Sequence, residues 1–188
     1  MRQFDILNVV DVESTCWEKN SPNGMVGEII EVGITPYHIR QGTVGERDSW
    51  MIKPEKSTVS EFCTSLTGIT QEDVDEDGLP FAEVCDALRK EYKTNLRPWG
   101  SWGEYDRRML NNEARAKKCG FPFSPYHLNI KLLFSLFFGL GKQIGLMEGV
   151  HKSRLQFDGD QHKAEDDAYN TAKVLEVVNR CFRKGHGI

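Results

Sequence analysis

The sequence has 188 residues, of which 39% are apolar and 28% are charged, and no repeated or low-complexity segment interrupts it. This length supports one hydrophobic core of ordinary size, so we expect a single domain over residues 1–188. The net charge of −4 argues against nucleic-acid binding, which normally requires a basic surplus. This objection weakens if several of the acids hold divalent cations, because the cations would cancel the negative charge.

The apolar run Leu132–Leu140 is far shorter than a membrane span, and the first residues do not form the apolar core of a signal peptide. The five cysteines are not closely paired, which favours reduced, buried thiols over a disulfide framework or a zinc site. We therefore expect a cytoplasmic protein that does not act at a membrane.

In chain order, the first elements expected are three short strands. β-Branched and aliphatic residues fill Phe4–Val12 and Glu28–Thr35, and Pro36 is expected to end the second strand. Trp50–Ile52, just before Pro54, predicts a third strand and completes a meander.

From Thr70 onward the spacing changes to that of helices, with one apolar stripe of Phe81, Val84, Cys85 and Leu88. The later elements expected are a strand at Leu96–Trp99, a helix at Asp106–Lys118, a strand at His127–Ile130, an apolar helix ending near Gly139 or Gly141, and a long helix from about Lys163. Three strands followed by alternating helices and strands predict an α/β fold with a mixed sheet.

Two acids, Asp11 and Glu13, end the first predicted strand, and the two-residue period of a strand puts both on one face. Neighbouring carboxylates on an otherwise apolar strand repel each other and resist burial, so a cation or a shared proton would compensate them. An exposed strand end with solvated acids explains the pair equally well.

The start of the last predicted helix adds a histidine and further acids. The helical period places Asp167 toward the packed side of that helix, and it predicts that Asp166 is solvated. His162 lies five residues before Asp167, too far round to share its face, so we expect it on the preceding loop. A histidine at a helix start is more often a surface or capping residue than a catalyst.

Asp106 is the fourth candidate acid, just beyond a predicted strand. A favourable charge in the first turn of a helix would explain it, and Glu104 would serve that purpose equally well.

Taken together, the order of these segments resembles the three motifs of the DEDDh 3′-to-5′ exonuclease family: Asp-x-Glu on the first strand, an isolated Asp, and His followed five residues later by Asp. The stretches DVESTCWE at Asp11–Glu18 and EFCTSLTGITQ at Glu61–Gln71 resemble its Eri-type exoribonuclease branch. The resemblance runs from Val9 to about Val178.

This resemblance implies an RNase H-like fold, a mixed five-stranded sheet flanked by helices, and a two-metal mechanism with Mg²⁺, which Mn²⁺ could replace. It implies that Asp11 bridges both ions, that Glu13 and Asp167 hold one of them, and that Asp106 holds the other. His162 would be the general base, a task suited to a side chain that titrates near neutral pH.

The resemblance also implies a partner, the 3′ end of single-stranded RNA, and a nucleoside 5′-monophosphate as product. It suggests that Thr15, Phe62, Leu66 and Tyr105 line the pocket of the terminal nucleotide, although Phe62 and Leu66 suit a hydrophobic core equally well. Lys117, Lys118, Lys152 and Arg154 are candidates for phosphate contacts along the strand, although scattered basic residues are usually solvated surface.

Two other functions stay open on sequence grounds. Single-stranded DNA is an alternative substrate, since no 2′-hydroxyl reader is recognisable. A catalytically inactive nucleic-acid-binding module of the same fold is another. Asp73–Gly78 begins like a calcium-binding loop, but Pro80 and Val84 break the pattern, so we expect a solvated loop between helices.

Overall fold

The computed structural model describes residues 3–186, without the side chains of Asn23 and residues 184–186. Six strands form one mixed sheet in the order β3-β2-β1-β5-β6, and β4 also pairs with β2. The strands are β1 (Ile6–Ser14), β2 (Ile29–His38), β3 (Thr43–Val44), β4 (Asp48–Met51), β5 (Trp99–Ser101) and β6 (His127–Asn129). β2 is antiparallel to β1, β3 and β4, whereas β1, β5 and β6 run parallel to one another.

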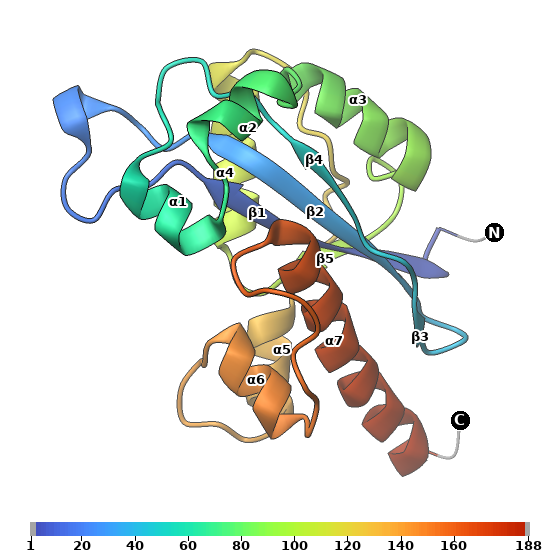
Figure 1. The fold of residues 1–188 in the computed structure, drawn as a ribbon. Helices are drawn as coiled ribbons and strands as arrows, with labels where there is room; N and C mark the ends of the chain where they lie inside the picture. Colours follow the sequence, from blue (N-terminus) through green and yellow to red (C-terminus); the bar gives the residue numbers. More distant parts are fainter. Residues whose placement is uncertain (1–2, 187–188) are drawn as a thin grey trace.

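Helices cover both faces of this sheet (Figure 1). They are α1 (Glu61–Thr67), α2 (Gln71–Glu76), α3 (Phe81–Tyr92), α4 (Tyr105–Ala116), α5 (Ile130–Phe137), α6 (Leu146–Lys152) and α7 (Ala164–His186), with a short 3₁₀ turn η1 (Pro22–Gly24). Within residues 3–186, no helix combines the length and the apolar character that crossing a bilayer requires.

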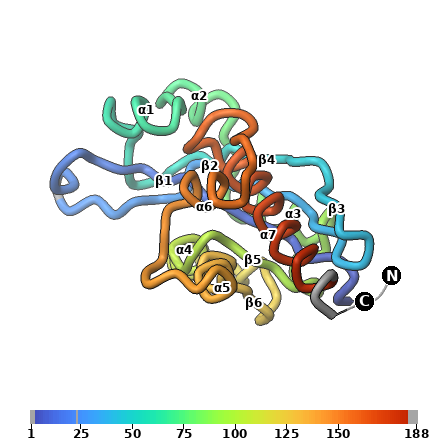
Figure 2. Tube along the Cα trace, turned by 90° about the horizontal axis from the view of Figure 1, so that it is seen from below, coloured from blue at the N-terminus to red at the C-terminus, as the bar shows by residue number. Residues whose placement is uncertain are grey.

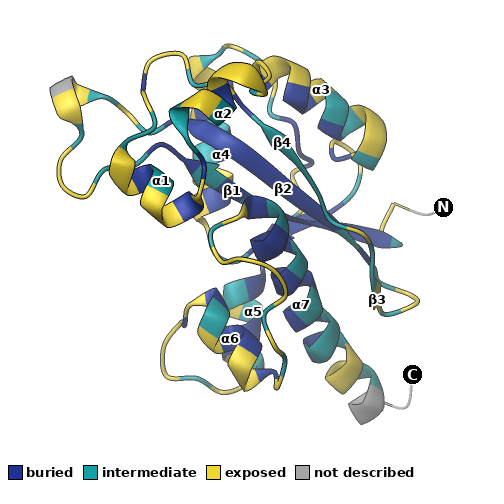
Figure 3. Ribbon diagram, in the orientation of Figure 1, coloured by how far each residue is buried: buried dark blue, intermediate teal, exposed yellow. Residues whose placement is uncertain are grey.

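The two faces of β1 have different partners, as its two-residue period predicts. Val10 and Val12 are buried against the apolar faces of α3 and α4. On the other face, Leu7 and Val9 pack against Ala172 and Leu175 of α7. β1 and β2 are dark along most of their length in Figure 3, so they form the centre of the core.

The segment between β1 and β2, which carries η1, extends beyond one end of the sheet in both Figure 1 and Figure 2. α7 lies below the sheet in Figure 1, so it is in front of the sheet in Figure 2, and it begins close to β2. The start of α4 also approaches β1, through Asp106 and the Val12 N–H, so the end of β1 has the starts of α4 and α7 near it.

The predicted α/β fold is confirmed, and the differences are local. β2 does not end at Pro36 but continues to His38. Pro36 is tolerated because the β4 pairing ends at Ile34 and the β3 pairing begins at Tyr37, so the missing N–H falls between two ladders. The two-residue β3 is the strand beyond the five expected.

Other elements shift or had no sequence signal. Leu96 lies in a turn, and the strand expected at Leu96–Trp99 begins only at Trp99. The helices α1 and α6 were not anticipated. The segment expected as a solvated loop at Asp73–Gly78 begins inside α2, where Asp73 and the N-cap Thr70 hydrogen-bond each other reciprocally.

Candidate active site

Asp11 and Glu13 lie on the face of β1 that α7 covers, opposite Val10 and Val12. Both acids are partly buried, which contradicts the alternative of a freely solvated strand end. In the register of the sheet, Asp11 pairs with Gly33 and Glu13 pairs with Glu31 of β2.

Asp106 reaches the same strand from the first turn of α4. The β1–β5 ladder stops at Val9, and beyond it Asp106 Oδ1 accepts a hydrogen bond of 3.2 Å from the backbone N–H of Val12. Asp106 is 4% exposed, whereas the side chain of Glu104 is 58% exposed. The two acids that the sequence left equivalent are thus distinguished by burial and by this contact with β1.

The start of α7 is held against the sheet by two residues of β2. A Cβ atom at Gly33 would lie 2.1 Å from the backbone carbon and oxygen of Ala164, so only glycine allows this approach. Beside it, Glu31 Oε2 accepts a 2.9 Å hydrogen bond from the Ala164 N–H, one of the amides that a helix leaves unpaired at its N-terminus. This packing brings Asp167 to Asp11 and Glu13.

His162 lies on the loop before α7, as its spacing predicts. Its backbone is left-handed, with φ of 65°, and its N–H donates to Asp167 Oδ2 at 3.3 Å. Glu13, His162 and Asp167 each have one side-chain atom that could bind a metal ion, and these three atoms lie within 4.8 Å of one another. Residues from β1, the loop and α7 thus converge on one point.

The electrostatics of this cluster follow from burial and crowding. Burial, followed by the charges of Asp167, Glu31 and Asp106, raises the pKa of Glu13 to about 9. Burial likewise raises the pKa of Asp167 to about 7 and that of Asp106 to about 6. The pKa of Asp11 lies well above its usual value, because burial and four neighbouring carboxylates disfavour its charge. Several carboxylates would therefore hold protons near neutral pH unless cations replaced them.

The donor set fits divalent cations. Asp167 Oδ1 is buried and has no hydrogen-bond partner within the described part of the chain, a costly state for a carboxylate oxygen. Carboxylate oxygens are the ligands that Mg²⁺ and Mn²⁺ prefer, and an imidazole lies beside them. Asp11, Glu13, Asp106 and Asp167 can supply such a site.

Asp166 corrects one sequence prediction. It was expected to be solvated, yet it is 5% exposed and forms a 2.6 Å ion pair with Arg47. The helical period alone could not foresee a partner that lies 119 residues earlier in the chain.

Glu31 is a buried acid that our sequence analysis missed. It faces Glu13 directly across the strands, a repulsive arrangement for two like charges, and its pKa is raised by burial. A charged residue in the apolar run IIEVGI was the signal that could have identified it.

The four residues suggested for the terminal nucleotide do not have equal access to solvent. Phe62 and Leu66 project from one side of α1 and are each 39% exposed, so the alternative that they belong to the core is wrong. Tyr105 is 45% exposed, and its hydroxyl lies 2.7 Å from Ser14 Oγ. Thr15 is buried, and its hydroxyl already pairs with Ser57 Oγ at 2.8 Å and with the Glu28 N–H.

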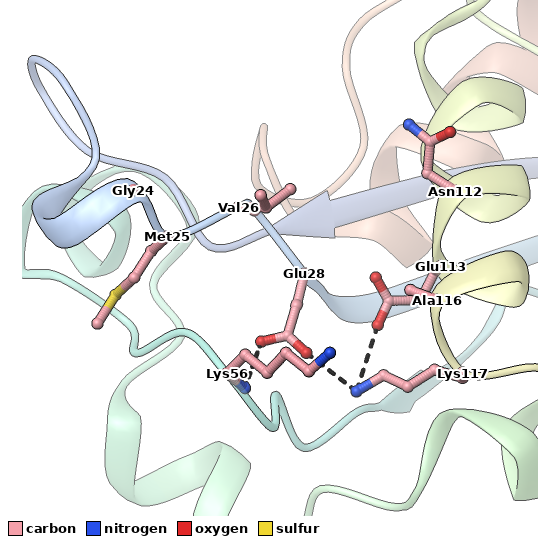
Figure 4. A pocket seen from close by; sticks show the side chains of 10 residues that line it. Gly24, Met25, Val26, Glu28, Lys56, Asn112, Glu113, Ala116 and Lys117 are labelled. Carbon is pink, nitrogen blue, oxygen red and sulfur yellow. Dashed lines mark hydrogen bonds and ion pairs between the residues drawn. The ribbon is translucent and has the colours of Figure 1, made fainter.

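A separate cleft of about 530 Å³ lies between α4 and the segment before β2 (Figure 4). At its base the Lys117 ammonium is 2.9 Å from Glu28 and 3.1 Å from Glu55. Burial acts to raise the pKa of Glu28, but hydrogen bonds from Lys117, Ser57 and backbone amides outweigh it and lower this pKa to about 2. Lys117 is therefore committed to an ion-pair network, which contradicts its suggested role in phosphate contacts.

Comparison with known proteins agrees with this geometry. The family model described as Exonuclease (RNase_T) matches residues 9–175. The human 3′-5′ exoribonuclease 1 is 30% identical over 182 residues, which cover 91% of this chain and 51% of that protein. The chain thus spans about half the length of such curated relatives. The probable 3′-5′ exonuclease KapD of Bacillus subtilis is 29% identical over 176 residues, covering 93% of this chain and 84% of KapD.

Solved structures give the same picture. The nuclease domain of 3′hExo, described as a DEDDh family member bound to rAMP, superimposes with a TM-score of 0.83 at 26% identity and covers 97% of this chain and 94% of that chain. Pop2p of S. pombe in a Mg²⁺- and Mn²⁺-bound form shares the fold, with a TM-score of 0.73 at 16% identity over 95% of this chain and 84% of that chain. Because the family model matches most of this chain, the chain belongs to the exonuclease (RNase_T) family and to its metal-dependent DEDDh nucleases.

Proposed function

We propose that this protein is a 3′-to-5′ exoribonuclease that hydrolyses the terminal phosphodiester bond of RNA and releases nucleoside 5′-monophosphates. One observation carries the proposal: Glu13 of β1 and Asp167 of α7 lie beside His162, and Asp106 of α4 lies close enough for its charge to act on both, although these residues lie far apart in the sequence. The names of the relatives support degradation in the 3′-to-5′ direction and RNA as the substrate.

Asp11, Glu13, Asp106 and Asp167 are the residues that would hold two Mg²⁺ ions, which Mn²⁺ could replace. When bound, such ions neutralise charge around the phosphate and favour ionisation of a bound water. The chain itself supplies the positions: Asp106 is tied to β1 through the Val12 N–H, and Asp167 is tied to the loop through the His162 N–H.

His162 is the general base in this proposal. Its imidazole lies beside Glu13 and Asp167, where the attacking water would be held, and it takes the proton that this water loses. His162 itself has a left-handed backbone, with φ of 65°, and its N–H is bonded to Asp167.

The proposed substrate is a single-stranded 3′ end. Phe62, Leu66 and Tyr105 offer exposed apolar and aromatic surface on which a terminal base can stack without sequence preference. The hydroxyl of Thr15 is already paired with Ser57 and with the Glu28 N–H. We therefore propose that Thr15 forms part of the pocket wall and makes no hydrogen bond of its own to the nucleotide.

The proposal is tested with a labelled RNA oligonucleotide in Mg²⁺ and in a chelator. Loss of a general base in His162→Asn should lower turnover about 10²-fold or more. The stability gained from Mg²⁺ should remain. His151→Asn, an exposed histidine on α6, is the matched control and should keep full activity. Undegraded RNA with Mg²⁺ present would favour the inactive binding module instead.

Matched RNA and DNA oligonucleotides decide the substrate. Faster cleavage of single-stranded DNA would replace RNA in the proposal and leave the site assignment intact.

We further propose that residues 1–188 form one exonuclease domain, and that the protein works in the cytoplasm. All five cysteines are free thiols, which fits a reducing compartment.

A further inference from the structure

A second cluster of polar residues lies behind the candidate active site, on the far side of the loop that carries His162. We call residues 158–162 the histidine loop. It precedes α7, and its residues bond to the first two turns of that helix and to Arg47, which lies between β3 and β4. Arg47, Asp158, Asp166 and Asn170, which make these contacts, are not among the residues proposed to hold cations or to act as the base.

Asp166 is the centre of this cluster. Its Oδ1 accepts from Arg47 Nη1 at 2.6 Å, and its Oδ2 accepts from the backbone N–H of Asp160 at 2.8 Å. Gly159 has φ of 90°, and a Cβ atom there would lie 2.2 Å from Asp166 Oδ2. The loop therefore lies directly on the buried carboxylate, and glycine is needed for that approach.

Arg47 and Asn170 hold the beginning of the loop. Arg47 donates to the carbonyl and to the carboxylate of Asp158, each at 3.2 Å. Asn170 is fully buried, accepts from the Asp158 N–H at 3.0 Å, and donates to the Asp158 carbonyl at 2.9 Å. The guanidinium of Arg47 also lies 4.9 Å from the centre of the Tyr169 ring, which limits its own motion.

These contacts fix the loop at residue 158 and again at residue 160, two positions before the histidine. The backbone N–H of His162 bonds to Asp167 at 3.3 Å, and the left-handed conformation of His162 is one that a free loop would seldom keep. The direction of the imidazole thus depends on how the preceding residues are held.

We propose that Arg47 and Asp166 are positioning residues that hold the histidine loop so that the imidazole of His162 faces Glu13 and Asp167. Neither is among the residues proposed to hold the cations or to take the proton, and the proposed action of both is through the loop. The inference rests on the proposed role of His162 as general base.

The first test replaces Arg47 by methionine, which keeps an apolar stem and removes the guanidinium. On an RNA oligonucleotide in Mg²⁺, kcat of Arg47→Met should fall about 10- to 100-fold, as for a catalytic group displaced by about 1 Å, with KM changed much less. Arg180→Met is the matched control. It removes an exposed ion pair between Arg180 and Glu176, both on α7, and its activity should stay within about twofold of the wild type.

The deciding test repeats the substitution in a His162→Ala background. A residue that acts through His162 has nothing left to position there, so Arg47→Met should change the residual rate by less than about twofold. Asp166→Asn, which keeps an oxygen for the Asp160 N–H but loses the ion pair, should show the same dependence and serves if Arg47→Met folds poorly. In ¹⁵N-histidine-labelled protein, the His162 ring signals should move in Arg47→Met while those of His151 stay.

An equal loss in both backgrounds would mean that Arg47 is merely structural, and it would overturn the inference. A kcat of Arg47→Met within twofold of the wild type would do the same. Full activity of His162→Ala alone would instead remove the general base, and with it the proposed function on which the inference rests.

Discussion

The crowding of acids around Asp167 makes a prediction about the protein without metal. Burial raises the pKa of Asp167 from its usual 3.8 to about 7, even though its carboxylate accepts the His162 N–H. At about 1.4 kcal/mol for each tenfold change in proton affinity, ionising Asp167 in the folded chain costs at most roughly 4 kcal/mol. Because the other acids and water relax, we expect about half of this, or about 2 kcal/mol, to be measurable.

The sign follows from the two states of the chain. The pKa of Asp167 is higher in the folded than in the unfolded chain, so ionisation favours unfolding. The cost is absent below about pH 4, grows as the pH rises, and is complete above about pH 7. Asp167→Asn removes the charge and keeps an oxygen for the His162 N–H. In a chelator at pH 8, the variant should therefore melt roughly 4–8 °C above the wild type.

Thermal melting in EDTA and in MgCl₂, at pH 8 and at pH 5.5, measures this effect. In EDTA, the difference in melting temperature between Asp167→Asn and the wild type should be smaller at pH 5.5 than at pH 8. Mg²⁺ should stabilise the wild type and have little effect on the variant, which should also lose nuclease activity. Asp86→Asn, whose side chain is 80% exposed on α3, is the control. A variant that melts below the wild type in EDTA at pH 8 would refute this reasoning.

Three further substitutions test other parts of the structure. Gly33→Ala should lower the free energy of unfolding in urea by about 1–3 kcal/mol or more and abolish activity, because its Cβ would meet the backbone of α7. Gly141→Ala is the control and should do neither, because a Cβ there has no atom within 4 Å. Phe62→Ala should raise KM for RNA by about tenfold with little change in melting temperature; an unchanged KM would remove Phe62 from the nucleotide pocket. Lys117→Met should lower the free energy of unfolding by about 3–5 kcal/mol by leaving Glu28 buried without its cation, and unaltered urea unfolding would contradict this account of the cleft.

Periodicity in the sequence was enough to place several site residues correctly. The two-residue period of β1 puts Asp11 and Glu13 on one face, and the helical period puts Asp167 toward the packed side of α7. The five-residue spacing placed His162 on the loop before the helix, where the structure has it. These statements need only the geometry of one element, which nearby residues determine.

Other features required the packing of distant segments. The choice of Asp106 over Glu104 depends on the Val12 N–H beyond the end of β5, and the burial of Asp166 depends on Arg47. The continuation of β2 past Pro36 depends on where its neighbouring strands stop and start. None of these partners is adjacent in the sequence, so no local pattern encodes them.

The sequence by itself determined the order of the acidic motifs, the α/β fold class and the face on which each acid lies. Only the tertiary structure decided how closely those faces approach, because Gly33 lets α7 touch the sheet and Glu31 holds its first amide. The repulsion among the acids, and thus their affinity for cations, arises from that approach, since the energy between charges depends on distance and on exclusion of water.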